Sequence, residues 1–165
     1  MSGNDGKNGK KLPYLLSAAL VTALAAPVVM DSEGLVLRTY DDPAWGARLP
    51  TACYGETGPH IRHGQTYTVA ECTRLLDASL QRTWIKLRLC IVKPIAPNEA
   101  AALISWAYNV GTDAACKSTL VRKLNAGEPF CGELSRWVYA NGKKLNGLVK
   151  RRAKEQALCD GSRLD

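Results

Sequence analysis

The sequence lacks several features that would assign it to common functional classes. It contains no long run of basic residues interleaved with aromatic ones, so its net charge of +7 gives little support to nucleic-acid binding. It also has no C-x-x-C pair, and no cysteine precedes Cys53. These absences argue against a zinc site of the usual close spacing and against control by a thiol within the first 52 residues.

The chain does contain enough apolar material for one folded domain. Its 165 residues match the usual size of a single domain, and 46% hydrophobic residues with four Trp suffice for a core. This composition excludes a disordered chain. The basic balance suits an acidic polymer as partner, and an anionic cell-wall glycan fits it as well as a nucleic acid does. We expect a monomer that binds no nucleic acid.

An uncharged apolar run extends from Leu12 to Met30. As a helix it would be about 28 Å long, close to the hydrocarbon thickness of a bilayer. Lysines precede the run and acids follow it, which predicts a cytoplasmic tail over residues 1–11 and an outward-facing chain after the run. Its many Ala residues predict poor retention in lipid. Ala-Leu-Ala at 23–25 also permits a cleavable signal peptide, but a cut there would leave almost no spacer before Glu33.

Six cysteines follow, at positions 53, 72, 90, 116, 131 and 159. An exported domain meets an oxidising compartment, so disulfides are the default prediction, although the sequence permits many pairings. Two favoured pairings bracket helical segments: Cys131 with Cys159, and Cys72 with Cys90. A zinc site is the alternative, with the ligands Cys53, His60, His63 and Cys72. We expect no metal and no cofactor.

The distribution of Gly, Pro and apolar residues predicts an α+β fold that is mainly helical. Residues 39–68 are rich in Gly and Pro, which predicts short strands joined by turns. From Thr68 the apolar spacing becomes helical, and Thr68 with Glu71 has the pattern of a capping box. A second helix is predicted over residues 97–111, with Asn98 as its N-cap and Gly111 as its stop. Further helices are predicted over residues 118–127, 131–142 and 148–159.

Two carboxylic acids and a hydroxyl follow the apolar run. Glu33, Asp42 and Thr51 form the pattern E-x8-D-x8-T. Cleavage of a glycosidic bond needs one carboxyl that keeps its proton for the leaving oxygen and another that stays ionised to draw a proton from water. Taken singly, an acid after an apolar helix is usually a surface cap, and Asp before Pro is usually a turn residue.

Several longer motifs occur in order around these residues: EGLVLRTYDDP, PTACYG, WAYNVG, STLVRKLNAG and LSRWVYANGKKLNGLVKRRAKE. Together they resemble the phage-type lysozymes of glycoside hydrolase family 24, the muramidase endolysins, over roughly residues 30–160. The resemblance implies a lysozyme-like fold, with a small β-hairpin lobe and a larger helical lobe, preceded by an N-terminal apolar helix. It implies a muramidase domain over residues 31–165.

The resemblance also implies a role for each candidate. Glu33 matches the family's general acid, Asp42 the second carboxylate, and Thr51 the hydroxyl that positions the attacking water. The family pattern is E-x8-D-x5-T, so this chain has three additional residues within PAWGARLP, in the turn between the strands that carry Asp42 and Thr51. Relatives often have His where this chain has Glu56. The family inverts the anomeric centre, which requires carboxyl groups about 6.5 to 9.5 Å apart.

Other residues near these motifs have competing interpretations. Arg151 or Arg152 is expected to approach Glu33 and hold its carboxyl, although paired arginines are as often a solvated helix face. Asn109 and Gly111 are interpreted as a helix ending. Three aromatic residues are expected in the core rather than in a sugar cleft: Trp106, Trp137 and Tyr108.

The apolar run additionally resembles the segment of signal-arrest-release endolysins, which tethers the enzyme to the inner membrane and later slips out into the periplasm. We therefore expect hydrolysis of the β-1,4 bond between N-acetylmuramic acid and N-acetylglucosamine in peptidoglycan, for host cell lysis. While residues 12–30 sit in the membrane, Glu33 is held beside the bilayer and catalysis is off. Loss of membrane potential, as the resemblance implies, releases the segment and brings Glu33 opposite Asp42 and Thr51.

Two rival functions remain open from the sequence. One is a cysteine peptidase that cuts wall peptides, with Cys53 as nucleophile and His60 or His63 as base. The other is a noncatalytic module that clamps wall glycan in an aromatic groove.

Overall fold

The computed structural model describes residues 17–42 and 46–162, with the side chains of residues 42 and 46–48 outside that description. The predicted tail over residues 1–11 and the start of the apolar run, residues 12–16, also lie outside it. The elements follow in the order α1 (Ala18–Glu33), β1 (Val36–Asp42), β2 (Gly46–Cys53), α2 (Val69–Leu87), α3 (Pro97–Val110), α4 (Thr112–Cys116), α5 (Thr119–Ala126), the 3-10 helix η1 (Cys131–Arg136), β3 (Tyr139–Ala140), β4 (Lys143–Lys144) and α6 (Asn146–Cys159).

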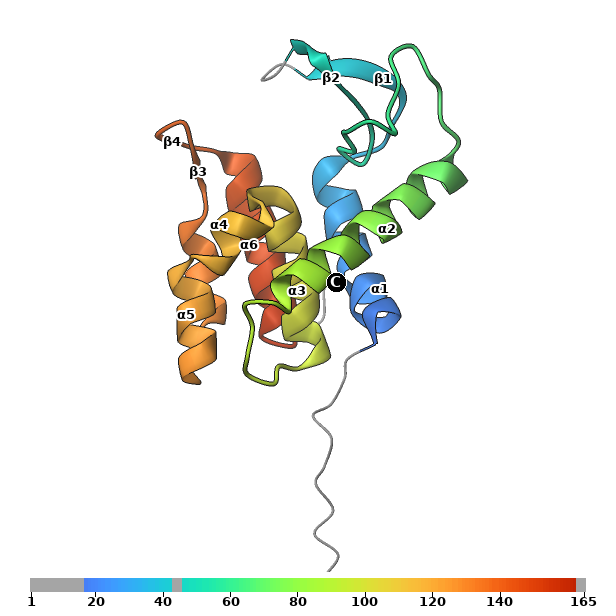
Figure 1. The fold of residues 1–165 in the computed structure, drawn as a ribbon. Coiled ribbons are helices and arrows are strands. Elements are labelled where there is room, and N and C mark those ends of the chain that lie inside the picture. The colour runs from blue at the N-terminus through green and yellow to red at the C-terminus, as the bar shows by residue number, and fades with distance from the viewer. Residues whose placement is uncertain (1–16, 43–45, 163–165) are drawn as a thin grey trace, which may run out of the picture.

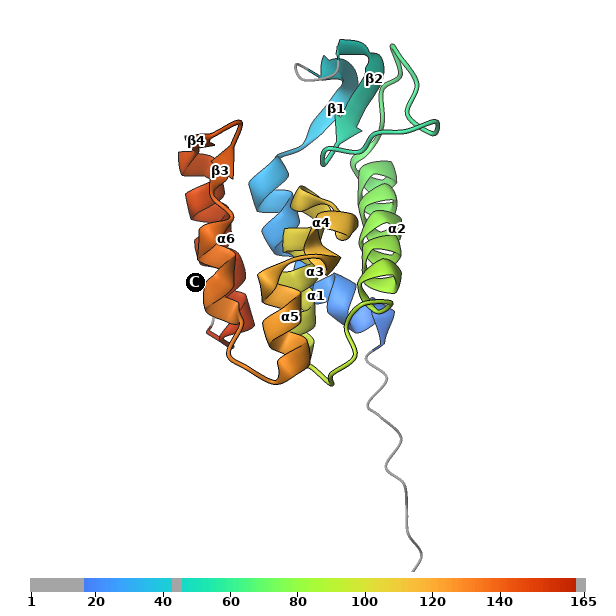
Figure 2. The same ribbon diagram turned by 60° about the vertical axis from the view of Figure 1, so that its left-hand side comes forward.

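Helix α3 lies at the centre of the larger lobe. Its residues from Ala100 to Ala107 are all buried, because small and apolar side chains dominate this stretch. Helices α1, α2 and α6 contact α3 around its circumference (Figure 2). Trp106 is fully buried and meets Trp137 edge-on, with ring centroids 5.1 Å apart. The prediction that these two Trp residues belong to the core is confirmed.

Helix α1 consists of the second part of the apolar run and packs into this lobe. Its buried face is formed by Val21, Thr22, Ala25, Val28 and Val29. On the opposite face, Leu20 and Leu24 remain exposed. The helix ends because Gly34 adopts a φ of 71°, in the left-handed region that favours glycine, and donates its N–H to Met30 O. In the described part of the chain, no helix combines the length and apolarity needed to cross a bilayer.

The smaller lobe is an antiparallel hairpin of β1 and β2, followed by an irregular segment that leads to α2 (Figure 1). The register pairs Val36 with Cys53 and Tyr40 with Thr51, with irregularities between the paired positions. Strand β2 already begins at Gly46. Residues 46–50 of PAWGARLP therefore belong to β2, whereas the sequence placed this whole stretch in the turn.

Helix boundaries agree with the sequence where a local signal sets them. Thr68 and Glu71 form the predicted capping box at the start of α2. At α3, however, Ala96 occupies the N-cap position, and Pro97 opens the helix. The prediction of Asn98 as N-cap is wrong, because its amide instead donates to the Cys159 carbonyl at 2.8 Å.

The helix predicted over residues 131–142 is also wrong. Only Cys131–Arg136 is helical, as a 3-10 helix, and the chain then forms the short β3–β4 hairpin. Asn141 and Gly142 both have positive φ, of 48° and 74°, which is the backbone of a tight hairpin turn.

Three disulfides join the six cysteines: Cys53–Cys72, Cys90–Cys116 and Cys131–Cys159. The predicted Cys131–Cys159 pairing is confirmed, and the predicted Cys72–Cys90 pairing is wrong. Cys72 lies near the start of α2 and faces the end of β2, so its bridge to Cys53 ties the hairpin lobe to the helical lobe.

Candidate active site

Glu33 is the last residue of α1 and lies where the two lobes meet. Its side chain is 23% exposed. Oε1 accepts a hydrogen bond from Arg151 Nη1 of α6. Oε2 faces Gly55, where an added Cβ would lie 3.2 Å from it. Gly55 therefore leaves room for the Glu33 carboxyl, and its φ of 80° also favours glycine.

A buried network holds Arg151 in place beneath Glu33. Its guanidinium donates to Glu155 Oε1 at 3.0 Å and to the Ser105 carbonyl at 3.1 Å. Glu155 is fully buried and also accepts from Ser105 Oγ at 2.7 Å. Nε and Nη2 of Arg151 are thus bonded to buried partners, so the guanidinium presents Nη1 to Glu33 in one orientation.

Arg152 belongs to the same network but turns away from Glu33. It donates to Glu155 Oε2, to the Trp137 carbonyl at 3.0 Å and to Asn109 Oδ1. Burial lowers the pKa of Arg152, an effect that the Glu155 carboxylate opposes. Of the two arginines that the sequence proposed for holding Glu33, the structure selects Arg151.

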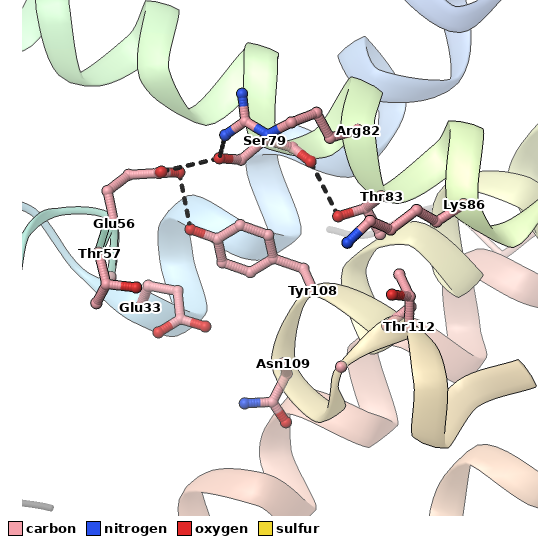
Figure 3. A pocket seen from close by; sticks show the side chains of 13 residues that line it. Glu33, Glu56, Thr57, Ser79, Arg82, Thr83, Lys86, Tyr108, Asn109 and Thr112 are labelled. Atoms are coloured by element: carbon pink, nitrogen blue, oxygen red, sulfur yellow. Dashed lines mark hydrogen bonds between the residues drawn. The ribbon is translucent and has the colours of Figure 1, made fainter. Parts of the chain in front are cut away.

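A pocket of about 430 Å³ opens in front of Glu33, between α2, α3 and the segment that follows β2 (Figure 3). Most of its walls are polar. The lining residues are Glu33, Gly55, Glu56, Thr57, Ser79, Arg82, Thr83, Lys86, Ala107, Tyr108, Asn109, Gly111 and Thr112. Such a lining suits a hydrated, polar ligand better than an apolar one.

Glu56 is the second carboxyl of this pocket, and the sequence did not identify it as a site residue. It is buried, and Oε2 accepts from Ser79 Oγ of α2 at 2.8 Å. Oε1 lies 3.1 Å from the Tyr108 hydroxyl of α3, and His60 Nε2 lies 3.6 Å from Oε2. Glu56 thus joins the segment after β2 to two helices. The one signal in the sequence was that Glu56 stands where relatives often have His.

Tyr108 packs against the core, as predicted, and it also lines the pocket. Its hydroxyl lies 2.8 Å from the Tyr54 carbonyl, in addition to its contact with Glu56. Burial, and then the charge of Glu56, raise the pKa of Tyr108 far above its ordinary value of 10.0. The phenol therefore remains protonated and serves as a hydrogen-bond donor.

The other two sequence candidates lie on the hairpin. Asp42 is the last residue of β1, where its backbone pairs with Gly46, and its side chain lies outside the described residues. Thr51 is 2% exposed on β2, and its hydroxyl lies 3.5 Å from the Leu49 carbonyl. Thr51 does not line the described pocket. Of the three candidates, the structure thus brings Glu33 to the pocket.

The disulfides overturn two sequence alternatives. Cys53 is bonded to Cys72, so it offers no thiolate for a peptidase nucleophile, and neither sulfur is available to zinc. Within the described ranges, no group of three or more His, Cys, Asp or Glu side chains is arranged to hold a metal.

Comparison with known proteins agrees with this geometry. The phage lysozyme family matches residues 30–155. A SAR-endolysin of bacteriophage PS119 is 40% identical over 129 residues, which cover 77% of this chain and 75% of that protein. An endolysin from Escherichia coli O157:H7 phage FAHEc1 has a similar structure, with a TM-score of 0.74 at 28% identity, over 86% of this chain and 94% of that one.

The muramidase domain of SpmX from Asticaccaulis excentricus is similar to the same degree, with a TM-score of 0.74 at 26% identity, over 87% of this chain and 95% of that one. The fold and the site thus define a lysozyme-like hydrolase that acts on peptidoglycan. The chain belongs to the phage lysozyme family.

Proposed function

We propose that Glu33 is the general acid in cleavage of the β-1,4 bond between N-acetylmuramic acid and N-acetylglucosamine. The observation that carries this proposal is the different surroundings of its two oxygens. Oε1 is held by Arg151, whereas Oε2 is turned toward Gly55 and the pocket. Oε2 therefore carries the proton and delivers it to the leaving glycosidic oxygen.

Asp42 is proposed as the second carboxylate and Thr51 as the hydroxyl that positions the attacking water. Both belong to the hairpin that lies across from the end of α1 (Figure 1). In an inverting mechanism, Asp42 draws a proton from water as that water attacks the face of the sugar opposite the leaving group. Three residues on separate elements then share one reaction, so their relative placement depends on how the two lobes meet.

Replacement of Glu33 by Gln tests the assignment. The amide keeps the size of the side chain but holds no transferable proton, so we expect lysis of purified cell walls to fall by at least about a hundredfold. Glu128→Gln is the matched control, because Glu128 is exposed and distant from the Glu33 pocket. New reducing ends on N-acetylmuramic acid would identify the bond, and their initial anomeric configuration would report inversion. Wild-type lysis by Glu33→Gln would refute the role.

We further propose that residues 12–30 first anchor the chain in the host inner membrane, with the amino end inside, and that the chain is later released into the periplasm. The related SAR-endolysins support this order. In the structure, residues 18–30 belong to α1, whose buried face packs on α2 and α3. The same residues cannot lie in lipid and in this core at once. The anchored chain would therefore lack the packed α1 that places Glu33 beside Arg151.

Polar contacts of α1 favour the docked state over the membrane state. Thr22 donates to Asp77 of α2 at 3.1 Å, and Lys154 of α6 donates to Asp31. Both contacts join α1 to other helices, so they exist only while α1 is docked. The weak apolarity of the run and these contacts together favour release once the potential collapses.

Leucine substitutions on the exposed face of α1 test the release step. Ala19 and Ala23 are exposed in the docked state, so Ala19→Leu with Ala23→Leu strengthens membrane retention without disturbing the buried face. We expect the double variant to remain in the membrane fraction and to delay lysis. Ala19→Ser with Ala23→Ser is the control. Equally rapid lysis by the leucine variant would contradict the anchoring proposal.

A further inference from the structure

Asn109 lies at the end of α3 and lines the pocket that contains Glu33. The sequence suggested no role for it beyond ending a helix. Its side chain is exposed to the pocket, and its Oδ1 accepts a hydrogen bond from Arg152 Nη2. Its Nδ2 has no partner within the described part of the chain.

The contact with Arg152 fixes which way the amide points. A guanidinium can only donate hydrogen bonds, so the amide atom that faces it must be the oxygen. The opposite orientation would place two donors against each other. Nδ2 is therefore turned away from Arg152, and Figure 3 shows it on the side of Asn109 where Glu33 lies.

Arg152 is itself immobilised, so the orientation of the amide is set before any ligand arrives. Its guanidinium is 1% exposed and is held by Glu155 and by the Trp137 carbonyl. The same Glu155 holds Arg151, which contacts Glu33. One buried carboxylate thus aligns both the proposed acid and the Asn109 amide through two arginines.

The amide offers the pocket two N–H donors and no acceptor. A sugar hydroxyl both donates and accepts, whereas the carbonyl oxygen of an acetamido group only accepts. Nδ2 could donate to either group, but the amide carbonyl oxygen is the stronger acceptor and brings no donor of its own toward the N–H, so it complements Nδ2 best. Both sugars of the proposed substrate carry an acetamido group.

We propose that Asn109 binds the acetamido carbonyl oxygen of an N-acetyl sugar through Nδ2, and so makes cleavage depend on N-acetylation. This assignment rests on the proposed function of the Glu33 pocket. Asn109 is a substrate-binding residue, and Arg152 and Glu155 are positioning residues that act through it.

Asn109→Asp separates this role from a purely structural one. The carboxylate keeps an oxygen for Arg152, so the network and the helix ending persist, but an oxygen replaces Nδ2 and faces the acetamido carbonyl. In an inactive Glu33→Gln background, the full-length variant should bind soluble N-acetylated glycan fragments about tenfold more weakly. Gln156→Glu on α6 is the matched control, because it makes the same chemical change away from the pocket. Unchanged affinity of Asn109→Asp would show that Asn109 serves only Arg152 and would overturn the proposal.

A change of substrate tests the acetamido group itself. In de-N-acetylated fragments an ammonium group, which only donates, replaces the acetamido group. The parent protein should then lose about tenfold in affinity, and Asn109→Asp should bind these fragments better than the parent does. If the loss caused by Asn109→Asp is the same for both fragments, Nδ2 binds another part of the glycan, and the acetamido assignment is wrong.

An error in the proposed role of Glu33 would give a different result from an error in the role of Asn109. If Glu33 is not the acid, the Glu33→Gln background will cleave the fragments during titration, and product analysis detects this directly. Thermal unfolding of each variant checks that binding is compared between folded proteins.

Discussion

The two lobes present their site residues in opposite ways. Behind Glu33, the helical lobe surrounds the charged groups with fixed partners, and the Arg151–Glu155–Arg152 cluster is almost fully buried. In the hairpin lobe, Leu35 directly before β1 and the strand residues Val36, Leu37 and Leu49 remain 37 to 41% exposed. The proposed acid Glu33 therefore rests on a tightly bonded cluster, while Asp42 and Thr51 belong to a lobe with more exposed apolar side chains.

The two lobes should therefore be sensitive to different substitutions. The acid depends on one electrostatic cluster, whereas the hairpin depends on the Cys53–Cys72 bridge and the Glu56 hydrogen bonds. Substitutions in the cluster should lower both stability and catalysis. Substitutions in the bridge or in these hydrogen bonds should lower catalysis mainly by letting the lobes move apart.

The largest effect is expected from Arg151→Ala. Removal of one partner from a buried ion cluster leaves Glu155 and Glu33 short of positive charge, which should cost about 3 to 5 kcal/mol of unfolding free energy. Lytic activity should fall by more than about tenfold because Glu33 loses its orientation. Denaturant unfolding and wall-lysis rates measure both. Lys150→Ala is the control, since Lys150 is exposed on the same helix. If Arg151→Ala behaves like it, the cluster does not hold Glu33.

A smaller effect is expected when the bridge between the lobes is removed. Cys53→Ser with Cys72→Ser should lower unfolding free energy by about 2 to 4 kcal/mol. Protease nicking near residues 54–66 should increase while α3 stays protected from hydrogen exchange. Loss of protection in both lobes together would contradict the idea that the bridge serves the hairpin.

Glu56→Gln should lower the unfolding free energy by about 1 to 2 kcal/mol. The amide has one oxygen and one nitrogen, so it cannot accept from both Ser79 and Tyr108 through two oxygens as the carboxylate does. Lysis should slow although Glu33 and Arg151 remain intact. Steady-state kinetics on soluble glycan fragments, compared with Glu128→Gln at an exposed position, checks this. If Glu56→Gln matches the parent enzyme, the hydrogen bonds of Glu56 do not set the position of the hairpin lobe.

The smallest expected effect is a change in the unfolding free energy at alkaline pH. The folded-state pKa of Tyr108 is raised, so this group contributes stability that is present below its ordinary pKa of 10.0 and is lost as pH rises above it. The parent protein should therefore lose up to about 1.4 kcal/mol more per pH unit above pH 10 than Tyr108→Phe does. Chemical denaturation at pH 9, 10 and 11 measures the two slopes. Parallel slopes would show that Tyr108 ionises as freely in the folded state as in the unfolded one.

The sequence predicted those parts of the fold that local chemistry controls. The Thr68–Glu71 capping box and the stops at Gly111 and Gly127 depend on residues within one turn of the helix end, so they were readable. Residues 131–142 had helical apolar spacing, but the Asn141–Gly142 turn outweighed it. Asn-Gly is a typical hairpin turn, but the helical spacing of the apolar residues around it led to the wrong prediction.

The residues of the site also differ in whether local sequence could predict them. Glu33 was found from the family motif. The stretch VKRRAKE indicated Arg151 or Arg152 as its partner, and the structure shows Arg151. Glu56 and Asn109 could not be found in this way, because their roles depend on Ser79, Tyr108 and Arg152, which are distant in sequence. Tertiary contacts of this kind leave no spacing pattern.

In the proposed release, residues 18–30 serve either as part of the membrane anchor or as the support of Glu33 in α1, and never as both at once. The most direct test compares activity per molecule of the membrane-bound and released forms of the same chain. Right-side-out membrane vesicles carrying the full-length protein would receive soluble glycan fragments on the outside, before and after the potential is collapsed. We expect cleavage only after collapse of the potential, by released protein. Equal cleavage by protein still in the membrane would contradict it.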